Sequence, residues 1–120
     1  MTPGELTRLV QEGETIRGTA LGGAALARAD LSGGIFEDVD FTAADLTATK
    51  WRESILVACR FDQARLPRAD FSKANLARCT LRGADLAEAR FQRSLVAECD
   101  FTGAGLARAD PPVAFVRGCG

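Results

Sequence analysis

The chain has 120 residues, and its 15 Lys and Arg against 16 Asp and Glu give a formal net charge of −1. This length predicts one domain, and the balanced charge argues against a nucleic-acid-binding protein, which needs a basic excess to neutralise phosphates. No apolar run approaches the roughly 18 residues that cross a bilayer, and the N-terminus lacks the features of a signal peptide. We therefore expect a cytoplasmic protein that makes no membrane contact.

The first predicted element is a short helix over residues 3–12. Residues 2–5, Thr-Pro-Gly-Glu, have the sequence of a capping box with proline at the first helical position, and Gly13 is a suitable C-terminal stop. Three apolar residues follow at helical spacing: Leu6, Leu9 and Val10. A partner-binding or membrane helix is the alternative, but this apolar edge is short and cations are few. We expect residues 1–13 to cap the structure that follows.

From Ile16 to Leu106 every fifth residue is large and apolar. A period of five fits neither the helix nor the strand, so we expect a chain that turns a corner every five residues and returns each large side chain to one interior. A small residue stands two positions before most of the large ones. The interior therefore alternates large and small side chains, as close packing in a narrow tube requires.

Between the small and the large residue a polar one is common. Examples are Ala29-Asp30-Leu31, Ala69-Asp70-Phe71 and Ala84-Asp85-Leu86. This motif resembles that of the pentapeptide-repeat family, and the resemblance covers about residues 16–110. It implies an all-β solenoid, namely a right-handed quadrilateral β-helix with four repeats and 20 residues per coil, which we assign to residues 14–110.

Residues twenty positions apart support this coil length. Positions 26, 46, 66, 86 and 106 are all leucine, and every cysteine falls in one column: Cys59, Cys79, Cys99 and Cys119. A straight column with a spacing of about 4.8 Å cannot surround one zinc ion. We interpret the cysteines as small buried hydrophobic residues and expect no metal and no cofactor.

The polar position also forms columns, and these alternate in charge. One of them contains Asp30, Lys50, Asp70, Arg90 and Asp110. A slip by one coil would place like charges together, so we expect this alternation to fix the register of the coils.

We predict that residues 111–120 form a degenerate last repeat. Pro111 stands where a large apolar residue is due, and proline cannot donate to a backbone ladder. The repeat resumes at residues 113–116, and we expect no capping helix after it. This end is then frayed or covered by another molecule, which makes Val113, Phe115 and Val116 candidate interface residues.

A second candidate interface is an apolar column at the outward, normally polar position. Its members are Ile35, Ile55, Leu95 and Phe115, with Asn75 interrupting them. Val57, Ala77 and Ala97 lie on the same predicted wall and widen it. Local packing at a corner would explain single exposed apolar residues. A contiguous apolar patch is more typical of an interface.

The sequence offers no credible catalytic site. Histidine is absent, so no imidazole can activate a hydroxyl or bind a metal, and no glycine-rich loop joins a strand to a helix. We therefore expect a non-enzymatic interaction or scaffold protein that presents flat walls to a protein partner. One version of this expectation is a homodimer, in which the partner is a second copy of the chain bound through the C-terminal coil or through a wall.

The resemblance alone implies an alternative function. Some pentapeptide-repeat proteins mimic duplex DNA and bind DNA gyrase, which protects it from quinolones or toxins. Such proteins are strongly acidic and longer, whereas the charges here are interleaved and the predicted rod is short. A role as one component of a larger secreted or effector system is a third possibility.

Overall fold

In the computed structural model, which describes residues 1–110 and 116–117, the chain begins with helix α1 (Pro3–Gln11). The predicted capping box is present, because the Thr2 hydroxyl accepts a hydrogen bond from the Glu5 amide at 3.1 Å while Glu5 Oε1 accepts one from the Thr2 amide at 3.3 Å. Leu6 and Val10 are buried in the same core as the solenoid interior. The helix therefore covers the N-terminal end of the solenoid, as the sequence predicts.

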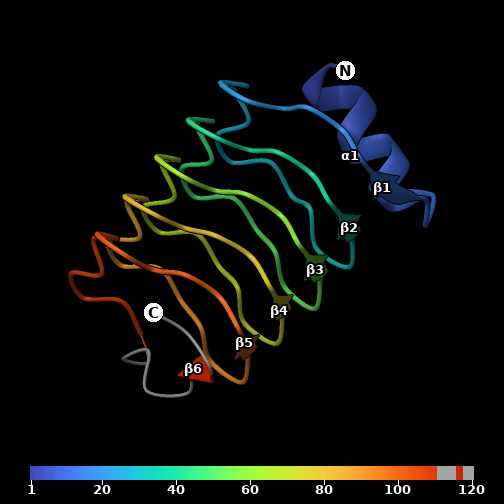
Figure 1. The fold of residues 1–120 in the computed structure, drawn as a ribbon. Coiled ribbons are helices and arrows are strands. Elements are labelled where there is room, and N and C mark those ends of the chain that lie inside the picture. Colours follow the sequence, from blue (N-terminus) through green and yellow to red (C-terminus); the bar gives the residue numbers. More distant parts are fainter. Residues whose placement is uncertain (111–115, 118–120) are drawn as a thin grey trace.

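After the helix, a short strand recurs every twenty residues. The strands are β1 (Thr15–Arg17), β2 (Ile35–Glu37), β3 (Ile55–Val57), β4 (Asn75–Ala77), β5 (Leu95–Ala97) and β6 (Val116–Arg117). They pair in parallel in that order and form one wall of the coils, with α1 beside β1 at the N-terminal end (Figure 1). Ile35 pairs with Ile55, twenty residues on, so one coil contains 20 residues. The predicted parallel β-solenoid is confirmed.

The other walls of each coil are held by single parallel bridges. On one of them Asp45 pairs with Arg65, and Arg65 pairs with Asp85. The Leu46 amide donates to the Arg65 carbonyl at 2.7 Å, and the Arg65 amide donates to the Ala44 carbonyl at 3.0 Å. These bonds satisfy backbone groups between successive coils on walls that contain no regular strand.

The corners follow the five-residue period. From residue 18 to residue 108, every fifth residue has a positive φ, and most of these residues are not glycine. Many corners are closed by a turn hydrogen bond, such as that from the Ala44 amide to the Phe41 carbonyl at 3.0 Å. Four such corners in each twenty-residue coil make the cross-section quadrilateral. The interior thus imposes a left-handed backbone conformation on residues that disfavour it.

The predicted large residues line the interior. Leu31, Trp51 and Phe71 are completely buried, and the Trp51 and Phe71 rings stack with centroids 5.7 Å apart. The indole Nε1 of Trp51 donates to the Thr49 hydroxyl at 2.7 Å, so its polar atom is satisfied inside the core. Leu106, which belongs to the coil that begins with β5, is only partly buried.

The cysteine column is also interior. Cys59, Cys79 and Cys99 are buried, which confirms that they serve as small core residues, whereas Cys119 lies outside the described residues. Hydrogen bonding among neighbouring thiols, together with burial, raises the pKa of Cys79 far above its usual range. Within residues 1–110 and 116–117 no group of His, Cys, Asp and Glu is arranged to hold a metal ion. The same residues include no helix long and apolar enough to span a membrane.

Candidate interaction surface

The wall formed by the strands is the surface on which the predicted apolar column lies. In each of β2 to β5 the middle residue is buried while the first and third residues face outward. Leu95 is 67% exposed and Ile55 is 40% exposed, and among the described residues Met1 is the other exposed large hydrophobic residue. Ile35 and Val57 face the same way but are half-buried.

Three consecutive strands of this wall carry no charge at their outward positions. We call this surface the uncharged wall. Its residues are Ile55, Val57, Asn75, Ala77, Leu95 and Ala97. Toward the N-terminus it ends at the ion pair between Arg17 and Glu37, whose Nε and Oε1 atoms are 3.3 Å apart. Because side chains one coil apart are in register, these six form a continuous apolar strip broken only by one amide.

Two charged residues border the uncharged wall at the corner that follows the strands. Arg78 follows β4 and Glu98 follows β5, and both are exposed with positive φ. Among the ion pairs within residues 1–110, neither Arg78 nor Glu98 takes part. Their charges are therefore available to a molecule that covers the wall.

The aspartates of the other walls are occupied locally. Asp40 Oδ1 accepts from the Thr42 amide at 2.9 Å and also from the Thr42 hydroxyl, and the same arrangement joins Asp100 to Thr102. These bonds hold the pKa of Asp40 below its usual value. The sequence pattern of Asp, a large residue and then Ser or Thr could have predicted these hydrogen bonds, but our sequence analysis did not include it. Such carboxylates stabilise their own turn rather than act as free acids or bases.

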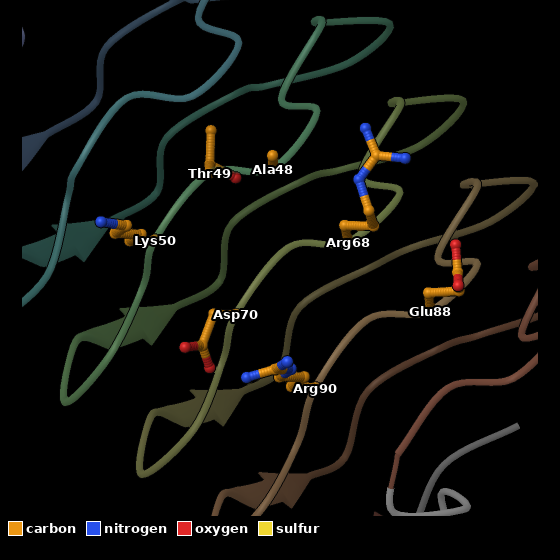
Figure 2. A pocket seen from close by; sticks show the side chains of 7 residues that line it. All are labelled: Ala48, Thr49, Lys50, Arg68, Asp70, Glu88 and Arg90. Atoms are coloured by element: carbon orange, nitrogen blue, oxygen red, sulfur yellow. The ribbon is translucent and has the colours of Figure 1, made fainter.

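A surface pocket of about 320 Å³ lies along three successive coils (Figure 2). Lys50, Asp70 and Arg90 line it from one column, and Arg68 and Glu88 lie beside them. The two signs alternate from coil to coil, as the sequence predicts. The closest ion pair of Asp70 is nevertheless with Arg52, at 3.2 Å, rather than with a member of its own column. A lining of interleaved charges offers no cluster of one sign for a charged substrate.

Comparison with known proteins identifies the repeat. The family model of pentapeptide repeats matches the sequence in 8 copies, over residues 16–50, 54–93 and 81–110. The chain belongs to the pentapeptide repeat family. Comparison with curated protein sequences finds no match.

Solved structures of other pentapeptide repeat proteins share the fold. HetL, involved in the regulation of heterocyst differentiation in the cyanobacterium Nostoc sp. strain PCC 7120, is 25% identical with a TM-score of 0.69, over 81% of this chain and 55% of HetL. This chain thus spans about half the length of HetL. A pentapeptide repeat protein of the Arabidopsis thaliana thylakoid lumen is 27% identical with a TM-score of 0.66, over 88% of this chain and 74% of its own.

A more distant structure bears on the alternative function. QnrB1, a plasmid-mediated fluoroquinolone resistance protein, is 22% identical with a TM-score of 0.58, over 87% of this chain and 54% of QnrB1. At that identity the likeness shows the fold alone.

The structure separates the two candidate interfaces of the sequence analysis. Ile35, Ile55, Val57 and Leu95 share one wall of this pentapeptide repeat protein. Val113 and Phe115 lie outside the described residues. Val116 belongs to β6, where its backbone pairs in register with Val96. The uncharged wall is therefore the candidate interface whose side chains the structure describes.

Proposed function

We propose that this protein is a non-enzymatic interaction protein that binds a protein partner through the uncharged wall. The observation that carries the proposal is the exposure of Leu95 and Ile55 on a flat strip without charge. Water contact with a contiguous apolar strip is unfavourable, and burying it against a partner removes that cost. Interfaces between proteins commonly place such uncharged residues at the centre and charged ones at the rim.

The architecture suits binding. The wall is built on strands whose middle residues are completely or almost completely buried, so its outward side chains stand on a rigid frame. A preorganised surface loses little conformational freedom on association. We also propose a cytoplasmic location, because the buried cysteines Cys59 and Cys79 are free thiols, as is usual in a reducing compartment.

The charge distribution favours this function over mimicry of DNA. A mimic needs a continuous acidic surface, whereas the acidic columns here are interrupted by cations. Arg60 lies 3.8 Å from Asp40, and Arg82 lies 2.6 Å from Asp100. In this proposal the likeness to QnrB1 is therefore one of fold and does not include a role in fluoroquinolone resistance.

Site-specific photo-cross-linking tests the proposal. A photoreactive side chain replaces Leu95 in one variant. In the control it replaces the exposed Gln63, at a corner that does not border the uncharged wall. In native cells we expect a discrete cross-linked protein from position 95 and none from position 63. Equal cross-linking from both positions, or none from position 95, contradicts a binding role for the uncharged wall.

A further inference from the structure

A second surface hollow has cations as its only charged lining residues. We call it the basic hollow, and it is lined by Arg52, Ser72, Lys73, Gln92 and Arg93. We infer that it binds a compact phosphate group, either free or carried by a phosphate monoester. The inference goes beyond the proposed function, because it concerns another surface and another class of ligand.

The hollow has a volume of about 280 Å³ and spans three successive coils. Ser72 is buried, whereas Arg52, one coil before it, and Gln92, one coil after it, are exposed. A short side chain between two long ones therefore forms the floor of the hollow. Lys73 and Arg93 stand at the corner beside this floor, where both have a positive φ.

These two corner cations are the one exception to the charge alternation of the coils. From residue 14 to residue 110, charged residues twenty positions apart have opposite signs, as Glu53 and Lys73 do, except for Lys73 and Arg93. The Lys73 amide donates to the Gln92 carbonyl at 2.9 Å, so the two cations lie at the same corner of adjacent coils, whose backbones are roughly 4.8 Å apart. Among the residues that the structure describes, neither cation takes part in an ion pair. Their mutual repulsion is unfavourable, and an anion bound between them removes it.

The two long side chains beside the floor are held in place but keep donors for a ligand. Arg52 Nη1 donates to Asp70 Oδ2 at 3.2 Å, and Gln92 Nε2 donates to Asp110 Oδ2, also at 3.2 Å. A guanidinium has five N–H groups and a carboxamide has two, so both side chains retain N–H groups for further hydrogen bonds. Side chains that are already fixed by one bond lose less conformational freedom when they bind a ligand.

The surrounding charges favour a compact dianion over a longer polyanion. A phosphate monoester has a charge of about −1.5 to −2 at pH 7 and three acceptor oxygens, which suits three cations around one hollow. Asp70, Asp110 and Glu53 stand beside these cations, so a nucleic acid would meet carboxylates beyond the hollow. Every lining residue except Ser72 is exposed, which leaves the rest of a monoester free to extend into water.

Titration with inorganic phosphate at constant ionic strength, followed in amide NMR spectra, tests the inference. We expect saturable shifts of the Ser72, Lys73 and Arg93 amides, with dissociation in the millimolar range because the hollow is open to water. Lys73→Gln combined with Arg93→Gln should weaken binding at least about tenfold, since hydrogen bonds to charged groups are the strong ones. The matched control combines Arg65→Gln with Arg78→Gln, which removes the same charge at exposed positions that form no ion pair among the described residues. The absence of saturable shifts in wild type, or equal weakening in the control, overturns the site.

Arg93→Glu separates binding from a structural role of the corner. This change restores the alternation of charge, so in chloride its melting temperature should be no lower than that of wild type. Phosphate should raise the melting temperature of wild type, because it binds the folded state, but should not raise that of the variant. An equal rise in both proteins overturns the site, and a lower melting temperature of the variant in chloride overturns the repulsion on which the inference rests.

Peptides identify the class and the source of the phosphate. A short phosphoserine peptide that binds at least as tightly as inorganic phosphate assigns the hollow to phosphorylated side chains, whereas binding of inorganic phosphate alone assigns it to free phosphate. Equal binding of the same peptide with glutamate in place of phosphoserine overturns the choice of phosphate over carboxylate. These measurements need no partner on the uncharged wall, so their failure leaves the proposed function standing.

Discussion

The non-glycine residues with positive φ at the corners lead to a prediction about stability. Ala48 occupies a corner with φ of 56°, whereas Ala87, also half-buried, lies at a position without a positive φ. A non-glycine residue in the left-handed region costs about 1–2 kcal/mol. Glycine relieves that cost, but it raises the entropy lost on folding by about 0.5–1 kcal/mol relative to alanine.

The two substitutions should therefore act in opposite directions. Ala87→Gly should destabilise by about 0.5–1 kcal/mol. Ala48→Gly should be neutral or stabilising, because the relieved strain of about 1–2 kcal/mol offsets the same entropy loss. The entropy term cancels in the comparison, so the free energies of unfolding of the two variants should differ by about 1–2 kcal/mol.

Urea denaturation followed by circular dichroism measures this difference. With unchanged m-values, the midpoint should be higher for Ala48→Gly than for Ala87→Gly. Equal destabilisation of both variants would refute the argument, because it would mean that alanine carries no strain at the corner.

Four further predictions concern the interior, its thiols, the surface charges and the alternative function. Leu66→Asp should abolish cooperative unfolding in a thermal melt, whereas Gln63→Glu should leave the melting temperature nearly unchanged; similar melting temperatures would show that Leu66 is not in the core. Native thiol titration should leave Cys59 and Cys79 unlabelled until denaturant is added, since a reagent cannot reach thiols that are completely or almost completely buried. Rapid native labelling would place their column outside. Hydrogen bonds from Thr102 and then Arg82 lower the pKa of Asp100 to about 2, below its unfolded value of about 3.9. The stabilisation from the ionised carboxylate is therefore present above pH 4 and lost as the pH falls toward 2. Asp100→Asn should lower the free energy of unfolding at pH 7 but not at pH 2, and an equal loss at both pH values would refute the linkage. Purified protein at micromolar concentration should leave gyrase supercoiling unchanged with or without a quinolone, and inhibition or protection would restore DNA mimicry as the function.

Much of the fold could be read from the sequence because a solenoid repeats one local arrangement. Each large residue from Ile16 onward returns to the same interior, and each column at a period of twenty becomes a real stack, as the Trp51 and Phe71 rings show. The apolar outward column could be found in the same way, since Ile55 and Leu95 break the polar pattern. Contacts at a constant separation of twenty residues turn a one-dimensional pattern directly into neighbours in space.

Tertiary structure alone decided the details of the surface. Asp70 forms its ion pair with Arg52 rather than with Lys50, its register neighbour in the adjacent coil, because the long Arg52 side chain reaches diagonally between coils. Exposure rises along one column from the half-buried Ile35 to Leu95 at 67%, although both occupy the same repeat position. The repeat determines which side of the wall a residue faces. Its ion pairs and its exposure depend instead on side chains from neighbouring coils and corners, whose lengths and conformations the period does not specify.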